Sequence, residues 1–279
     1  MTLLSSSHVD VIRRNNVTVL GNPEGRPIVF AHGFGCSQAT WRRVTPSFLE
    51  DYRVVLFDHV GAGASDLAAY DAGKYDSLHG YADDLLEILD ALDLRDAVYV
   101  GHSVSSMIGV LAAIQAPERF GSLILVGPSA RYVNDGSNDY VGGFEQADID
   151  ALLDALDANY LGWSSVMAPV IMGNAERPEL GEDLAESFCS IDPAIAGQFA
   201  RVTFLSDNRD DLARVSTPTL ILQNRDDAIA PESVGEFVRD NIPGSEYVVM
   251  NARGHIPNLS EPTELVRAIS AFLAPSPAR

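Results

Sequence analysis

Apolar and amphipathic stretches alternate along the first 126 residues of the chain. Short apolar runs predict buried strands at 26–31, 53–57, 96–100 and 123–126. Between the second and third of these, apolar residues from Tyr81 to Leu92 recur at helical spacing, and acidic residues occupy the other side of the same helix. This alternation predicts the α/β fold class, with a mostly parallel sheet and helices on both faces.

The pattern changes between residues 128 and 215. Helical periodicity there predicts helices at 149–160, 164–172, 180–189 and 193–205. Strand patterns return at 219–223 and 247–250, and a last helix is expected at 263–273. We therefore expect a core domain of residues 1–127 and 216–279, with a four-helix lid of residues 128–215 inserted between two strands. A lid above the carboxyl ends of the strands would cover a site located there.

The chain is strongly acidic. In 279 residues, 19 Lys and Arg stand against 39 Asp and Glu, which gives a net charge of −20. Because such a field repels phosphate groups and anionic lipids, neither a nucleic acid nor a membrane is expected as a partner. Cys36 and Cys189 form no C-x-x-C pair, and no metal site is predicted. No apolar run reaches signal-peptide or membrane-spanning length, residues 1–16 included, so a cytoplasmic location is expected.

A turn of small residues joins the strand predicted at 96–100 to a helical run at 105–115. It reads Gly101-His102-Ser103-Val104-Ser105, which follows the G-x-S-x-G pattern of a nucleophile elbow except at Ser105. In such an elbow the first glycine leaves room for the following helix, and the apex serine has strained backbone geometry that exposes its hydroxyl. Ser103 is therefore predicted to be a catalytic nucleophile.

A serine nucleophile needs a base, because its hydroxyl is almost fully protonated at neutral pH. His255 follows the strand predicted at 247–250, and Asp226 and Asp227 follow the strand predicted at 219–223. Acidic residues at the carboxyl end of a strand lie where catalytic groups of open α/β sheets gather. The order serine, acid, histidine is typical of one class of hydrolase triad. Spacing alone does not choose between Asp226 and Asp227.

The strand predicted at 26–31 leads into His32-Gly33-Phe34-Gly35. Glycines on both sides of Phe34 allow the backbone to turn its amide toward the serine. The backbone N–H groups of Phe34 and Val104 are therefore expected to form an oxyanion hole. The same glycines do not predict a dinucleotide site, since the G-x-G-x-x-G fingerprint is missing.

Further motifs identify a family. They are Gln38 and Trp41 after the Phe34 turn, the run Phe-Asp-His-Val-Gly-Ala-Gly-Ala-Ser-Asp at 57–66, Gly-Gly-Phe-Glu at 142–145, Phe-Cys-Ser at 188–190 and Asp-Pro at 192–193. With the elbow, they resemble the RsbQ group of α/β hydrolases, which are bacterial stress-signalling enzymes, and the similar plant karrikin and strigolactone receptors. A serine at position 105 is usual in the receptor branch. The resemblance covers residues 15–273 and implies an α/β-hydrolase fold, with Asp227 as the acid and His255 as the base.

The resemblance also implies a ligand cavity. Tyr132, Phe144, Trp163 and Phe204 fall on positions that wall the cavity in this group, and Met167 stands where plant relatives tend to have phenylalanine. The implied pocket is apolar, closed and suited to a small hydrophobic ester, lactone or enol ether. Asn258 departs from the histidine or glutamine that relatives often carry at this position, near the pocket rim.

Two functions from different classes are compatible with these residues. The first is a serine hydrolase that works through an acyl-enzyme and needs no cofactor. The second, implied by the resemblance, is a ligand-sensing module with slow turnover that acts through a protein partner. A cofactor-free haloperoxidase or a carbon–carbon bond hydrolase would use the same triad. A haloalkane dehalogenase is disfavoured, because it would carry an aspartate in place of Ser103.

Overall fold

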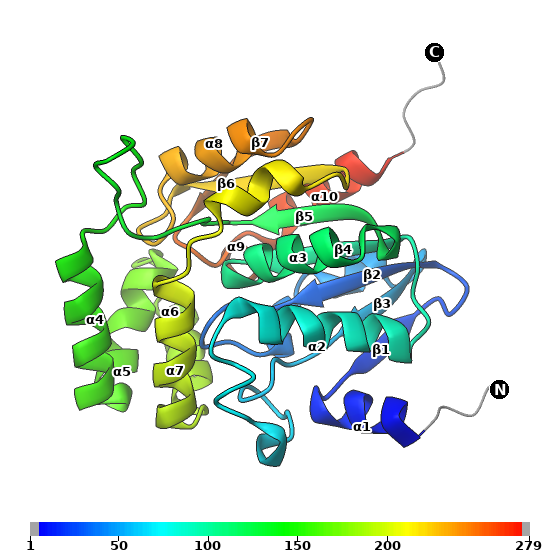
Figure 1. Cartoon of the computed structure of the whole chain (residues 1–279), viewed down its shortest axis with the longest axis horizontal. Helices are drawn as coiled ribbons and strands as arrows, with labels where there is room; N and C mark the ends of the chain where they lie inside the picture. Colours follow the sequence, from blue (N-terminus) through cyan, green and yellow to red (C-terminus); the bar gives the residue numbers. More distant parts are fainter. Residues whose placement is uncertain (1–5, 275–279) are drawn as a thin grey trace.

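The computed structural model describes residues 6–274, which contain a seven-stranded sheet with helices on both faces (Figure 1). Residues 1–5, where the segment considered for a signal peptide begins, lie outside the described range. The strand order is β1-β3-β2-β4-β5-β6-β7; β1 runs antiparallel to β3, and the other neighbours are parallel. The strands are β1 (Thr18–Gly21), β2 (Arg26–Ala31), β3 (Tyr52–Leu56), β4 (Ala97–His102), β5 (Phe120–Val126), β6 (Thr219–Asp226) and β7 (Glu246–Arg253). The predicted α/β architecture is confirmed.

Two apolar layers enclose the sheet because successive strand side chains point to opposite faces. Val29 and Tyr99 belong to the layer under one set of helices, whereas Phe30 and Val100 belong to the opposite layer. The first layer is covered by α2 (Leu78–Ala91), α3 (Val104–Gln115) and α8 (Glu232–Asn241). The second is covered by α10 (Pro262–Leu273) and the 3-10 turns η1 (Gln38–Trp41) and η2 (Thr45–Phe48). The remaining elements are α1 (Ser6–Arg14), α9 (Pro257–Ser260), η3 (Leu67–Ala69), η4 (Pro117–Arg119) and η5 (Arg209–Arg214).

Four helices between β5 and β6 stand together beside the sheet (Figure 1). They are α4 (Gln146–Ala158), α5 (Tyr160–Met172), α6 (Pro178–Cys189) and α7 (Pro193–Phe204). A third apolar cluster joins them and extends to Phe34 and Ile256 of the core, so these helices pack on the loops at the carboxyl ends of the strands. We call them the lid; its limits at residues 128 and 215 stay a prediction. No helix within residues 6–274 is long and apolar enough to cross a membrane.

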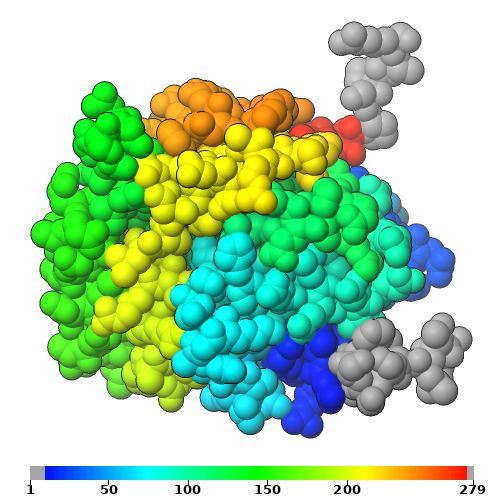
Figure 2. All heavy atoms as spheres, viewed as in Figure 1, coloured from blue at the N-terminus to red at the C-terminus, as the bar shows by residue number. Residues whose placement is uncertain are grey.

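Polar contacts fasten the lid to the core. Figure 2 shows the segment around residues 70–80 side by side with α7, and Gln198 Nε2 donates there to the carbonyl oxygens of Ala72 (2.7 Å) and Tyr75 (3.0 Å). At the base of the lid, Arg131 Nη1 lies 2.6 Å from Asp207 Oδ2, and the two residues also form an antiparallel bridge. The segments that enter and leave the lid are therefore held together.

The sequence pattern did not reveal β1 or α8. The strand β1 is only four residues long, and its apolar residues Val19 and Leu20 are exposed, so it has no alternation of buried and exposed positions. Helix α8 buries only Val234, Gly235 and Val238, and this short stripe includes a glycine, which is a weak helix former. Both elements are specified by the neighbours on which they pack rather than by a strong pattern of their own.

Candidate active site

The turn between β4 and α3 holds Ser103 in unusual backbone geometry. Its φ is 58° and its ψ is −124°, in a region that residues other than glycine rarely adopt. A Cβ atom at Gly101 would overlap the carbonyl oxygen of Ser105, so only glycine fits there, as the sequence predicted. Ser103 is buried, with 5% of its surface accessible to solvent. The elbow therefore presents a serine hydroxyl at the amino end of α3, where free N–H groups favour negative charge.

The structure brings Ser103, His255 and Asp227 into one hydrogen-bonded chain. His255 Nε2 lies 2.7 Å from Ser103 Oγ, and His255 Nδ1 lies 2.7 Å from Asp227 Oδ2. Asp227 follows β6 and His255 follows β7, so neighbouring strand ends supply both side chains. With the Nδ1 proton directed at the carboxylate, Nε2 is free to accept the proton of the serine hydroxyl.

Asp226 lies outside this chain. Its carboxylate is mostly exposed and pairs with Arg253 at 3.3 Å. The second oxygen of Asp227, Oδ1, accepts the backbone N–H groups of Ile229 (2.8 Å) and Ala230 (3.0 Å). One carboxylate therefore orders the loop after β6 and contacts the imidazole as well.

The loop after β2 lies against the elbow. A Cβ atom at Gly33 would be 3.1 Å from the Cβ of Ser103, so the backbone next to Phe34 approaches the serine closely. Val104 is the first residue of α3, where an N–H group has no partner within its own helix. Both predicted oxyanion-hole residues are therefore beside Ser103, and their role stays a prediction. No group of three His, Cys, Asp or Glu side chains in the described part of the chain could hold a metal ion.

Comparison with known proteins agrees with this arrangement. Residues 26–262 match the family described as α/β hydrolase fold. The chain belongs to the α/β-hydrolase family. It is similar to the karrikin insensitive 2 receptor CA of Petunia hybrida, with 40% identity over 90% of this chain and 93% of the relative. It is also similar to a strigolactone esterase of Arabidopsis thaliana, with 39% identity over 96% and 99%. The solved structure of a hydrolase from Oleispira antarctica has a TM-score of 0.92 and 38% identity, covering 98% of this chain and 99% of that one.

In this α/β hydrolase a small cavity of about 30 Å³ lies beside Ser103 and is lined by residues of both the core and the lid. Three predicted pocket residues line it: Tyr132, Trp163 and Phe204. Phe144 and Met167 do not line this cavity, so their contact with a ligand stays a prediction. Both are half-buried and pack on the apolar cluster of the lid instead.

Sequence reasoning missed other residues that line the cavity. They are His102, Ile171, Phe188, Thr203, Ile229 and Ile256. Ile229 and Ile256 stand within two residues of Asp227 and His255, so their place beside the triad residues was available as a sequence signal. Lid helices carry Ile171, Phe188 and Thr203. The direction in which these side chains point depends on how the helices pack against one another.

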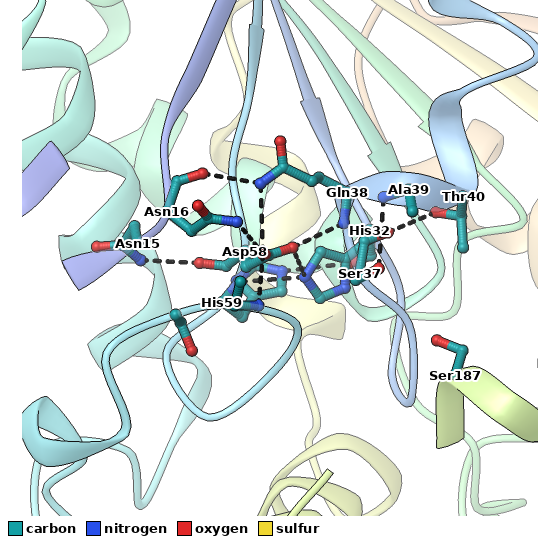
Figure 3. A network of polar contacts seen from close by, with 12 residues as sticks. Asn15, Asn16, His32, Ser37, Gln38, Ala39, Thr40, Asp58, His59 and Ser187 are labelled. Atoms are coloured by element: carbon teal, nitrogen blue, oxygen red, sulfur yellow. Dashed lines mark hydrogen bonds and ion pairs between the residues drawn. The ribbon is translucent and has the colours of Figure 1, made fainter. Parts of the chain in front are cut away.

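Asp58, two residues after β3, links three segments next to the loop that follows β2 (Figure 3). Its side chain accepts hydrogen bonds from the backbone N–H of Gln38 (2.7 Å), the side chain of Asn16 (2.8 Å) and the backbone N–H of Ala64 (3.0 Å). A buried carboxylate that accepts several N–H groups joins the segments that donate to it. Asp58 thus fixes the end of the loop that carries Phe34 through the backbone N–H of Gln38.

Ser105, which replaces the last glycine of the elbow motif, contacts the start of the same loop. Its Oγ donates to the carbonyl oxygen of His32 at 2.5 Å. The buried His59 Nε2 lies 2.7 Å from the same Oγ and donates to it when this nitrogen carries the proton. A glycine at position 105 could not make this link between α3 and the oxyanion loop.

Three buried histidines, His32, His59 and His102, are expected to make the stability of the fold sensitive to acid. Burial lowers the pKa of His32 and His59, and it lowers the pKa of His102 to about 3. In the unfolded chain these groups titrate near pH 6.5, so below this pH the unfolded state binds more protons than the folded state. The free energy of unfolding is therefore expected to fall on acidification by about 1.4 kcal/mol per pH unit for each histidine that stays neutral.

Urea unfolding at pH 7 and pH 5 measures this effect. The His102→Gln variant should lose less stability between these two pH values than the unchanged protein, because one buried histidine no longer contributes. His79 is exposed, so His79→Gln should leave the difference unchanged. Equal losses for the two variants would contradict the assignment to buried histidines.

Proposed function

We propose that this α/β hydrolase is a serine esterase that cleaves a small hydrophobic ester, lactone or enol-ether substrate. The hydrogen-bonded chain from Asp227 through His255 to Ser103, at the apex of a nucleophile elbow, carries this proposal. Relatives named as an esterase and as a hydrolase support it. The cavity wall supports an uncharged substrate, because most of its side chains are apolar.

In the proposed reaction, Ser103 Oγ forms a bond to the carbonyl carbon while His255 Nε2 takes the hydroxyl proton. The N–H groups of Phe34 and Val104 stabilise the oxyanion, and Asp227 stabilises the charged imidazole. When the intermediate collapses, the bond to the leaving oxygen breaks and His255 returns the proton to it. Water then attacks the acyl-enzyme by the same route, which releases the acid and restores Ser103.

Covalent trapping tests this proposal. Diethyl 4-nitrophenyl phosphate phosphorylates activated serines, and intact-mass and peptide analysis are expected to show one diethylphosphoryl group on Ser103. The Ser103→Ala variant should remain unlabelled. Ser190 is an exposed serine at the end of α6, so Ser190→Ala should be labelled like the unchanged protein. Equal labelling of Ser103→Ala would reject the proposed nucleophile.

The name of the Petunia relative favours ligand sensing as a second candidate, because that protein is called a receptor. In this reading the same triad cleaves its ligand slowly, and the lid presents a surface to a protein partner in the cytoplasm. Single-turnover and multiple-turnover rates separate the two candidates. Fast repeated turnover favours a metabolic esterase, whereas one slow turnover followed by ligand-dependent capture of a partner favours sensing.

A further inference from the structure

Two buried hydroxyl groups share the cavity beside Ser103 and have no hydrogen-bond partner. Tyr132 and Thr203 both line the cavity, and each is only 1% exposed. Neither the Tyr132 hydroxyl nor Thr203 Oγ1 makes a hydrogen bond to any residue within 6–274. Most buried hydroxyl groups in proteins are paired, since an unpaired one loses its hydration without compensation. Two such groups in one small cavity therefore favour a ligand that carries a polar atom between them.

The proposed esterase reaction leaves these two hydroxyls without a role. Proton transfer belongs to His255, and the carbonyl oxygen of the substrate belongs to the amides of Phe34 and Val104. His102 also lines the wall, and its Nε2 lies 2.7 Å from the carbonyl oxygen of His255. Its Nδ1 has no hydrogen-bond partner within the described residues, but it lies on the side of the imidazole that faces Gly33. Tyr132 and Thr203 thus remain available to a part of the substrate that does not react.

The local structure offers neither hydroxyl an internal partner. A threonine in a helix commonly bonds to the carbonyl oxygen one turn earlier, but Thr203, near the end of α7, makes no such bond. The ring of Tyr132 packs edge-on against Phe204, with 5.1 Å between ring centroids, so apolar contacts fix its position. Burial raises the pKa of Tyr132, and the closeness of its hydroxyl to the Ser103 side chain acts in the opposite direction. The hydroxyl is thus a neutral donor that lies next to the nucleophile without a hydrogen bond of normal geometry to it.

We propose that Tyr132 and Thr203 form a polar subsite that holds an oxygen atom within the acyl group of the substrate. This inference rests on the proposed esterase function and narrows its substrate class. The free volume beside Ser103 is small, about 30 Å³, which favours a small group next to the two hydroxyls. The acyl group is therefore short, and it carries an ether, hydroxyl or carbonyl oxygen besides the one in the ester. A plain hydrocarbon chain of the same length leaves both hydroxyls unpaired in the transition state.

Two esters of equal size test the subsite. Phenyl methoxyacetate and phenyl butyrate differ by one oxygen atom in place of one methylene group. Their kcat/KM values are each divided by the rate constant for hydroxide hydrolysis, which removes the difference in intrinsic reactivity. We expect the corrected ratio to favour methoxyacetate by at least about tenfold. Equal corrected values would overturn the subsite.

Variants assign the preference to the two hydroxyls. Tyr132→Phe and Thr203→Val should each lower the ratio severalfold, whereas Thr203→Ser, which keeps a hydroxyl, should retain most of it. Tyr70 supplies a matched control, because its hydroxyl is also buried without a partner within the described residues but lies outside the cavity. Tyr70→Phe should leave the ratio unchanged. If the hydroxyls hold only a water molecule, both esters slow equally in the variants and the proposal fails.

Binding to Ser103→Ala separates the subsite from the esterase proposal. The indole of Trp163 is in the cavity wall, so tryptophan fluorescence reports binding of the intact esters to this variant. If the unchanged protein cleaves neither ester but the variant binds methoxyacetate more tightly, the esterase proposal fails and the subsite is supported. If the unchanged protein cleaves both with equal corrected rates and the variant binds both equally, the subsite alone fails.

Discussion

The Asp227→Asn variant is expected to hydrolyse phenyl acetate about 10,000-fold more slowly in kcat than the unchanged protein. Asp227 Oδ2 lies 2.7 Å from His255 Nδ1 and keeps the proton on this nitrogen. An asparagine side chain that donates to Nδ1 would shift the proton to Nε2, which faces Ser103 Oγ at 2.7 Å. The imidazole would then have no lone pair to accept the serine proton.

Asp226→Asn is the matched control for this prediction. Asp226 is the preceding residue, and its carboxylate pairs with Arg253 at the surface. Exposed ion pairs contribute at most about 1 kcal/mol to the free energy of unfolding, so the variant should fold normally. Because the Asp226 carboxylate pairs with Arg253 and not with His255, kcat should stay within about twofold of the unchanged protein. Circular dichroism and urea unfolding verify that both variants fold. Equal losses of kcat would show that the carboxylate of Asp227 has no special role.

The choice between Asp226 and Asp227 shows where sequence reasoning ends. Both residues follow an apolar strand, and spacing left them equivalent. In the structure β6 extends through Asp226, whose side chain faces solvent, whereas Asp227 turns inward and accepts two backbone N–H groups of the following loop. Which of the two carboxylates reaches His255 therefore depends on the residue at which β6 ends. The family resemblance favoured Asp227, and its carboxylate is the one in contact with His255.

Local motifs were predictable because their geometry depends on adjacent residues. The elbow is an example: Gly101, Ser103 and the helix after them specify one tight turn, to which the hydrogen bond from the Ser103 N–H to the carbonyl oxygen of Val126 (2.8 Å) is added. The cavity wall was only partly predictable. Trp163 and Ile171 line the cavity from α5, but Met167, one turn from each, does not. The packing of α5 on its neighbours decides which side chains reach the cavity, and a single sequence does not record that packing.

Gly254→Ala is expected to impair both the fold and the active site. The residue precedes His255 and has a φ of 74°, which costs an alanine about 1–2 kcal/mol. Its Cβ atom would also overlap the carbonyl oxygen of Met172, at the end of lid helix α5. Next to this contact, the N–H of His255 donates to the carbonyl oxygen of Ile171 at 2.8 Å. An alanine must therefore displace either the lid helix or the backbone that carries His255.

The expected loss for Gly254→Ala is at least about 3 kcal/mol in the free energy of unfolding, because strain in a packed region adds to the backbone cost. We expect kcat of the folded protein to fall about 100-fold, since a displacement near 1 Å is enough to misalign a proton transfer. Gly244→Ala separates the two effects. Gly244 has a similar φ of 71° and no heavy atom near its Cβ position, so the variant should lose only about 1–2 kcal/mol and keep its kcat. If Gly254→Ala behaved like Gly244→Ala in both measurements, the contact between the lid and the His255 loop would not control the position of the imidazole.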